Sequence, residues 1–393
     1  MRLRARHYAT GEVVDITCAG GVIDSVRPPA PGPADVEAGW VAPGLFDLQV
    51  NGCDGHSFNS DRLDADTVRH VVGVCRRHGI TGLCPTLVTN GFAALRHGLD
   101  TLRRACASDR VLSAAVPGIH LEGPYISPED GPRGAHPKQH VRPPDWDEFC
   151  RLQDAAGGRI RLVTLAPEHD GALEFIERLV GAGVVVALGH TAATGPRLRD
   201  AVRAGARLST HLGNGCAALL PRHDNCIWEQ LADDDLWASL ICDGHHLPAA
   251  VVRCFLRVKT PARTILTCDA SSLAGLPPGR YVEWSQEFEV RPEGKVVVPG
   301  TAYLAGSAVF TDACVDWLLR NTEAGLAEAL DMAGARPREL LRLPPRRLEP
   351  GHPADLVLFE YSPLTPSPLP HVGERGGGEG VFRVVETIVG GRR

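Results

Sequence analysis

Several features are missing from this sequence, and each absence narrows the possible functions. No two of its 12 cysteines have the C-x-x-C spacing, and they are spread over 393 residues, so a disulfide scaffold is not indicated. No apolar run is long enough for a membrane-spanning helix, and the basic first residues lead into no apolar signal-peptide segment. No block of Lys or Arg stands out. We therefore expect a cytoplasmic protein with neither a membrane nor a nucleic acid as its partner.

The remaining composition is typical of an ordinary globular protein. Apolar residues make up 44% of the chain and charged residues 22%, and the formal net charge is −6. The length suffices for one large α/β barrel with a small appended domain, or for two ordinary domains. Cys84, Cys242 and Cys268 lie within apolar runs, where reduced thiols act as small buried hydrophobic groups.

Eight short apolar runs predict eight buried β-strands. Their length and continuity are typical of strands covered on both faces, and amphipathic stretches with helical spacing lie between many of them. The runs are GLFDLQVN (44–51), GLCPTLVT (82–89), AAVPGIHLE (114–122), IRLVTLAPE (160–168), VVVALGH (184–190), ARLSTHL (206–212), WASLICDG (237–244) and RTILTCD (263–269). This alternation predicts an α/β fold, a (β/α)8 TIM-like barrel, with an open doubly wound sheet as the alternative.

The two ends of the chain have a different pattern. Residues 1–40 and 345–393 contain short strand-like pieces separated by turns, which predict one small β-sandwich domain formed by both termini. The barrel is then expected over residues 41–344. A Pro/Gly-rich stretch near 361–380 cannot form a ladder or bury much surface, so we expect a surface insertion without chemistry there.

Five of the predicted strands end in side chains that bind metals or transfer protons. These are His120 and Glu122 after the third strand, His190 after the fifth, His211 after the sixth, Asp243, His245 and His246 after the seventh, and Asp269 after the eighth. The carboxyl ends of barrel strands meet at one rim, so these side chains are expected to converge. One carboxylate and two imidazoles with an open water position are typical of a hydrolytic zinc site. Asp269 would then be free to take a proton from that water and return it to a leaving amine.

Eight motifs occur along the chain in a fixed order. They are VAPGLFDLQVNGCDG, HLEGPYIS, GAHPKQH, LGHTAAT, THLGNG, CDGHHLP, TCDA and LAGSA. In this order they resemble the N-acetylglucosamine-6-phosphate deacetylases of the amidohydrolase superfamily, over roughly residues 40–310. The resemblance implies the barrel of that superfamily, together with the small two-ended β domain.

The resemblance also implies roles for the residues that match. Glu122, His190 and His211 match the ligands of one divalent metal ion per subunit, with zinc expected and iron as the alternative. Asp269 matches the catalytic acid and base. His136 matches the histidine that helps to polarise the amide carbonyl.

The first strand departs from the pattern of many amidohydrolases. Where these carry His-x-His for a second metal, this chain has Gln49 and Asn51. Carboxamides are poor ligands for such cations, so a single metal is expected. We expect Gln49 to hold the water of that metal.

The resemblance assigns substrate contacts to a further set of residues. They are Ala135, His136, Asn214, Gly215, Arg222, His246 and Leu304. Here the chain has Gly-Asn-Gly-Cys at 213–216 in place of the family's aromatic-Asn-Ala-Met, although an anion contact remains available. Arg222 has the spacing of the family's phosphate-binding arginine, which acts in the neighbouring subunit's site, so a homodimer is implied. His223 and His245 are additional, and their role stays open.

The resemblance implies a metal-dependent hydrolase that deacetylates a small amino-sugar substrate. We expect it to convert N-acetylglucosamine 6-phosphate to glucosamine 6-phosphate and acetate. The alternative is another amide: an unphosphorylated N-acetyl sugar, an N-acyl amino acid or a cyclic amide. A barrel that serves only as a scaffold is not favoured, because every matched ligand and the proton-transfer aspartate are present.

Overall fold

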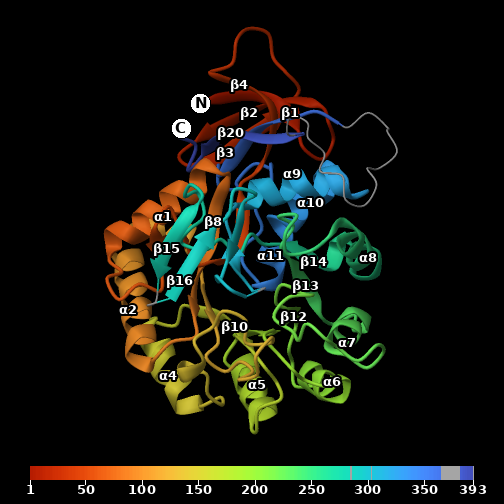
Figure 1. Ribbon diagram of the computed structural model, residues 1–393. Coiled ribbons are helices and arrows are strands. Elements are labelled where there is room, and N and C mark those ends of the chain that lie inside the picture. Colours follow the sequence, from red (N-terminus) through yellow and green to blue (C-terminus); the bar gives the residue numbers. More distant parts are fainter. Residues whose placement is uncertain (284–285, 302, 364–380, 393) are drawn as a thin grey trace.

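A computed structural model describes residues 1–283, 286–301, 303–363 and 381–392. Within these residues the chain forms a barrel of parallel strands surrounded by helices, with a strand-rich unit from both termini packed at one end (Figure 1). Most of the predicted insertion near 361–380 lies outside the described residues. No described helix has the length and apolar character needed to cross a membrane.

All eight predicted barrel strands are confirmed. Their spatial order is β14-β13-β12-β11-β10-β9-β8-β5, and every neighbouring pair is parallel. The strands are β5 (Leu45–Val50), β8 (Ile80–Val88), β9 (Ile119–Glu122), β10 (Ile160–Leu165), β11 (Val185–Leu188), β12 (Leu208–Ser209), β13 (Trp237–Leu240) and β14 (Thr264–Leu266).

Most of the helices cover the outer surface of the barrel, whereas α11 (Ala335–Leu340) lies at its centre in the view of Figure 1. The other α-helices are α1 (Ala65–Arg77), α2 (Phe92–Ser108), α3 (Arg110–Ala115), α4 (Trp146–Ala155), α5 (Ala172–Gly181), α6 (Gly195–Arg203), α7 (Cys226–Ala232), α8 (Ala249–Lys259), α9 (Thr311–Asn321) and α10 (Leu326–Met332). In α1, Val68, Val71, Val72 and Cys75 are buried, the spacing of one helix face, and the Asp64 side chain caps the first turn. These apolar faces join the strands in one continuous core.

One buried carboxylate closes the seam between β14 and β5, the two ends of the strand order. Only an isolated bridge, Val50 with Ala270, pairs the backbones at this point in the described residues. The Asp47 side chain is fully buried and accepts hydrogen bonds from both sides of the seam. Its four donors are the backbone N–H groups of Gln49 and Cys268, each at 2.8 Å, and the hydroxyls of Thr267 and Thr311, each at 2.5 Å.

The termini form a separate six-stranded sheet, which confirms the predicted β unit built from both ends. Its order is β20-β19-β4-β1-β2-β3, so strands from opposite ends of the chain are neighbours. The strands are β1 (Arg2–His7), β2 (Val13–Ala19), β3 (Val22–Arg27), β4 (Val36–Pro43), β19 (Leu356–Tyr361) and β20 (Phe382–Ile388). The sheet has its own apolar cluster, which includes Ile16, Ile23 and Leu358. The exact domain boundaries stay a prediction.

A small antiparallel sheet, which the sequence analysis did not predict, lies at the rim of the barrel. It consists of β15 (Gly279–Glu283), β16 (Gln286–Val290), β17 (Lys295–Val297) and β18 (Leu304–Ser307). Its contact with the barrel is direct, because the backbone N–H of Ser307 donates to the carbonyl of Asp269 at 2.8 Å. A two-stranded ribbon, β6 (Gly52–Cys53) with β7 (His56–Ser57), follows the first barrel strand.

Replacing Asp47 by alanine should destabilise the barrel strongly. The change leaves four donors without their acceptor, and an unsatisfied buried donor costs about 1–3 kcal/mol, so the free energy of unfolding should fall by about 3 kcal/mol or more. Urea denaturation of Asp47→Ala beside Asp61→Ala, an exposed loop position, measures the difference. Equal midpoints for the two variants would contradict the role assigned to Asp47.

Candidate active site

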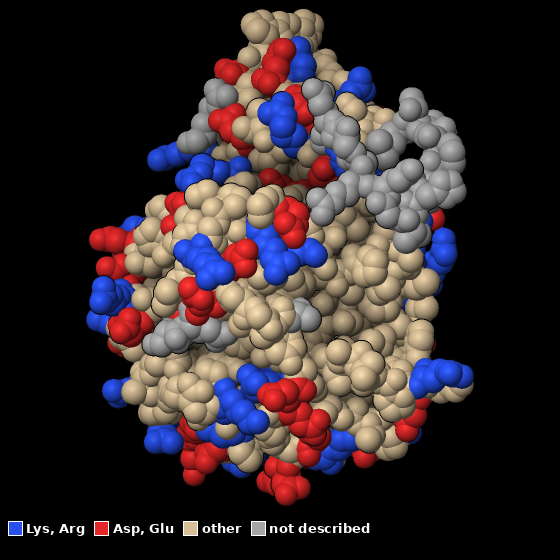
Figure 2. All heavy atoms as spheres, viewed as in Figure 1, with Lys and Arg blue, Asp and Glu red and all other residues tan. Residues whose placement is uncertain are grey.

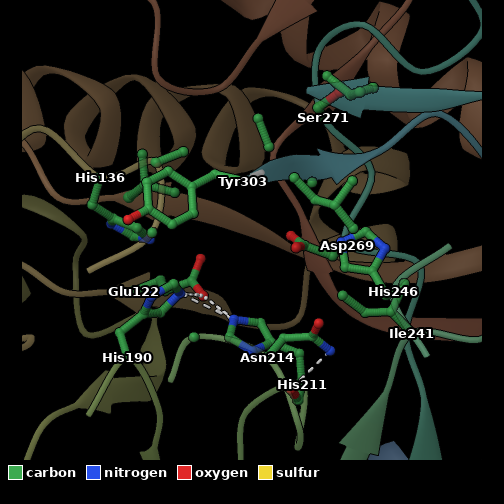
Figure 3. Close-up of a pocket in the computed structure, with 18 of the residues that line it drawn as sticks. Glu122, His136, His190, His211, Asn214, Ile241, His246, Asp269, Ser271 and Tyr303 are labelled. Atoms are coloured by element: carbon green, nitrogen blue, oxygen red, sulfur yellow. Dashed lines mark hydrogen bonds and ion pairs between the residues drawn. The ribbon is translucent and has the colours of Figure 1, made fainter. Parts of the chain in front are cut away.

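The strand ends bring the predicted metal ligands to one point on the rim. Glu122 is the last residue of β9, whereas His190 and His211 lie two residues beyond the ends of β11 and β12. Figure 3 shows their side chains pointing toward one another at the base of a pocket. Residues separated by up to 89 positions in sequence therefore form one cluster.

The cluster has the dimensions of a metal site. His190 Nε2 and His211 Nε2 lie 3.3 Å and 3.2 Å from Glu122 Oε1, and 3.1 Å from each other. For zinc bonds of about 2.0–2.1 Å in tetrahedral geometry, neighbouring ligand atoms lie about 3.3 Å apart. Although burial raises the pKa of Glu122, its contacts with the two histidines hold that pKa well below the ordinary value. Three potential ligand atoms facing one point fit a divalent cation.

Neighbouring groups orient these ligands. His190 Nδ1 donates to the carbonyl of Pro132 at 2.8 Å, which places the free lone pair of the ring on Nε2, toward the cluster. The amide of Gln49 donates to Glu122 Oε1 at 2.8 Å. Gln49 therefore contacts the ligand carboxylate in this structure, and its predicted hold on a metal-bound water stays a prediction.

A second set of three potential ligands shares two members with the first. Glu122, His136 and His190 have ligand atoms that all lie within 4.8 Å of one another. We prefer His211 to His136 as the third ligand because its contacts are shorter, at 3.1–3.2 Å. His136 Nδ1 instead lies 2.8 Å from the Thr89 hydroxyl. Burial and the nearby His190 lower the pKa of His136 to about 3, so its ring is neutral.

Asp269 lies in the same pocket, to the right of the cluster in Figure 3. Its Oδ1 accepts a hydrogen bond from the Asn51 amide at 2.8 Å. Burial and the Glu122 carboxylate raise the pKa of Asp269 well above its ordinary value, and the Asn51 contact opposes the rise. A buried carboxylate in the same pocket as Glu122, His190 and His211 is suited to accept and return a proton.

The backbone is strained at three of these positions. His190, His211 and Asp269 have φ angles of +50°, +34° and +49°. Such angles are unfavourable for residues other than glycine, and they concentrate at functional sites. Before His190, only glycine fits at position 189, because a Cβ there would lie 2.8 Å from the Cβ of Thr210. The apolar run VVVAL therefore ends at Gly189, where packing against Thr210 requires glycine, and the next residue, His190, has the unfavourable positive φ.

The predicted substrate contacts divide between two hollows. Ala135, His136, Asn214, Gly215, His246 and Leu304 line the pocket that contains the metal cluster, which has a volume of about 630 Å³. The exposed Arg222 lines an adjoining groove instead, together with Trp228 and His246. Neither Lys nor Arg is among the described residues of the metal pocket. Within one chain, the structure therefore brings together the residues to which the resemblance assigns a role, except Arg222. Of the other strand-end candidates, His120, Asp243 and His245 do not line this pocket.

Sequence reasoning missed several residues in and beside the pocket. Thr89, which contacts His136, directly follows β8, so the same strand-end rule could have found it. Glu283 and Tyr303 come from the small antiparallel sheet and its connections, for which we had no signal. His120, another strand-end residue, does not line the pocket. It is fully buried, and its Nε2 lies 2.8 Å from the Thr164 hydroxyl.

Comparisons with known proteins agree with this geometry, although no protein-family model matches the chain. The N-acetylglucosamine-6-phosphate deacetylase of Bos taurus is 37% identical over 338 residues, 82% of this chain and 80% of the relative. The N-acetylgalactosamine-6-phosphate deacetylase of Escherichia coli O157:H7 is 33% identical over 365 residues, 91% and 94% of the two chains.

A solved structure gives the same result. It is a mutant N-acetyl-D-glucosamine-6-phosphate deacetylase from Mycobacterium smegmatis in complex with N-acetyl-D-glucosamine-6-phosphate. It matches with a TM-score of 0.81 and 33% identity, and the match covers 91% of this chain and 94% of the other. With a metal-type cluster on the barrel rim and relatives of this identity over most of its length, the chain belongs to the N-acetylglucosamine-6-phosphate deacetylase family.

Proposed function

We propose that this protein removes the acetyl group from N-acetylglucosamine 6-phosphate, giving glucosamine 6-phosphate and acetate. The observation that carries the proposal is the triangle of Glu122, His190 and His211 with Asp269 in the same pocket. One divalent ion would be held by these three ligands, and zinc suits a set of two imidazoles and one carboxylate best, with iron as the alternative. Such an ion supplies Lewis acidity and makes water a nucleophile near neutral pH.

The protein's own groups divide the remaining work. Asp269 accepts the proton of the attacking water and returns it to the amine nitrogen as the C–N bond breaks. His136 Nδ1 lies 2.8 Å from the Thr89 hydroxyl. With that hydroxyl as the donor, the neutral ring would carry its proton on Nε2 and could donate a hydrogen bond to the carbonyl oxygen. Gln49, through its contact with Glu122, keeps the ligand carboxylate in place.

The phosphate end of the sugar would lie toward Asn214, Gly215 and His246. Because the described lining of the metal pocket has neither Lys nor Arg, we assign the missing cation to Arg222 of a second subunit. The protein is then a homodimer, and we place it in the cytoplasm. Ala135 and Leu304 would bound the sugar on its other sides.

Two observations favour alternative substrates. The similarity to an N-acetylgalactosamine-6-phosphate deacetylase over 91% of the chain favours the other sugar epimer. The pocket without Lys or Arg favours an uncharged amide, such as an unphosphorylated N-acetyl sugar.

Acetate release from a panel of amides should separate these substrates. With the zinc-loaded protein we expect turnover of N-acetylglucosamine 6-phosphate to exceed that of N-acetylglucosamine by about a hundredfold or more in kcat/KM, because lost phosphate contacts cost transition-state binding. N-acetylgalactosamine 6-phosphate tests the epimer within the same assay. Equal rates with and without phosphate would contradict the proposed substrate.

Replacing Asp269 by asparagine should abolish most activity without loss of metal. An amide of the same shape cannot transfer the proton, so kcat should fall by about a thousandfold or more. Metal analysis of Asp269→Asn should still find one ion per chain, whereas His190→Ala should lose both metal and activity. If Asp269→Asn kept nearly full activity, the proton-transfer role would be wrong.

Mixing two inactive variants should restore activity if Arg222 serves the partner's site. Arg222→Gln lacks the arginine and Asp269→Asn lacks the acid and base, but a hybrid dimer has one complete site. Refolding the two together in equal amounts should recover about a quarter of wild-type activity. An activity equal to the mean of the separate variants would contradict the shared site, as would a mass of a single 42.0 kDa chain in sedimentation.

A further inference from the structure

His246 differs from the other pocket histidines because its partner is a carboxylate. Its Nδ1 donates to Asp243 Oδ2 at 2.7 Å, and the two side chains are only 6% and 2% exposed. The other oxygen of Asp243 accepts from the backbone N–H groups of His245 and His246, both at 2.8 Å. One buried carboxylate thus fixes both the turn after β13 and the imidazole ring.

The contacts of Asp243 determine which ring nitrogen is available. Although burial raises the pKa of Asp243, the hydrogen bonds from His246 and the backbone outweigh it and hold that pKa below the ordinary value. An ionised carboxylate only accepts, so Nδ1 of His246 carries a proton in either charge state of the ring. Nε2 is the nitrogen left to meet another group.

The position of His246 indicates which group its Nε2 can meet. The residue lines both the metal pocket and the adjoining groove of Arg222, so it stands where the two hollows meet. His190 and His211 belong to the cluster with Glu122, and His136 is assigned to the carbonyl oxygen, whereas Figure 3 shows His246 beside Asp269. Among the described residues of the metal pocket, His246 is therefore the histidine that is assigned neither to the metal nor to the carbonyl oxygen.

The turn that carries Asp243 packs against α9 through Gly244 and Trp317. Gly244 has a φ of +77°, and a Cβ there would lie 2.5 Å from Trp317 Nε1. The turn therefore packs tightly against this helix and cannot shift outward without losing the contact.

We propose that Asp243 is a positioning residue for the reaction: its carboxylate holds the His246 ring so that Nε2 meets the anionic end of the substrate. The inference rests on the proposed function and adds a residue to it. Asp243 does not touch the reacting atoms, and its effect is exerted through His246.

Steady-state kinetics of Asp243→Asn test this role. Because the contact is made equally in the bound substrate and the transition state, KM should rise about tenfold while kcat stays within about twofold and the metal content is unchanged. Asp243→Glu, which keeps the charge, should recover part of the lost KM. Asp234→Asn, an exposed position, serves as the matched control and should behave as the wild type.

A double-mutant cycle separates positioning from general support of the fold. His246→Ala alone should raise KM as Asp243→Asn does, and adding Asp243→Asn to it should change kcat/KM by less than about twofold, because the two residues act as one unit. The inference would be overturned if Asp243→Asn lowered kcat/KM equally with and without His246→Ala, or if it had no effect in an otherwise active protein. Either result would leave the proposed function standing. A wild-type protein without activity on any sugar phosphate would overturn the proposed function as well.

Discussion

The carboxylate of Asp47 is the contact on which the geometry of the rim depends. It accepts hydrogen bonds from β5 and from the end of β14, so it joins the two edges of a strand order that backbone pairing barely closes. Gln49, which contacts the Glu122 carboxylate, lies on one side of this seam, and Asp269 follows on the other. One buried acid thus links the strand that carries Gln49 to the segment that leads to Asp269.

The rim of the barrel has both strained backbone angles and several ionisable side chains in one pocket. His190, His211 and Asp269 keep their unfavourable positive φ angles because the strands before them are fixed in a barrel with a continuous core. Figure 2 shows acidic and basic side chains interspersed over the visible face of the molecule rather than gathered in one patch.

Local sequence patterns predicted the barrel strands and the residues at their ends. The apolar runs located every barrel strand, and the polar residues after them placed Glu122, His190 and His211 among the candidates at the rim, because parallel strands bring their carboxyl ends together. The family resemblance then selected these three as the ligands. The small antiparallel sheet at the rim was not predicted, although β16 (QEFEV) alternates polar and apolar residues and buries Phe288 and Val290. So short a run does not by itself show where its apolar face packs. The side-chain closure by Asp47 was missed because a lone acid within an apolar run has no sequence signal that distinguishes its partners.

The central claim is that Glu122, His190 and His211 bind one divalent ion beside Asp269. Anomalous X-ray diffraction from crystals of the zinc-loaded protein, recorded on both sides of the zinc absorption edge, tests it most directly. The account predicts a single anomalous peak about 2.0–2.2 Å from one oxygen of Glu122 and from Nε2 of both histidines, with Asp269 outside bonding distance. A peak at His136 in place of His211, a second metal at Gln49 and Asn51, or no peak at the rim would contradict it.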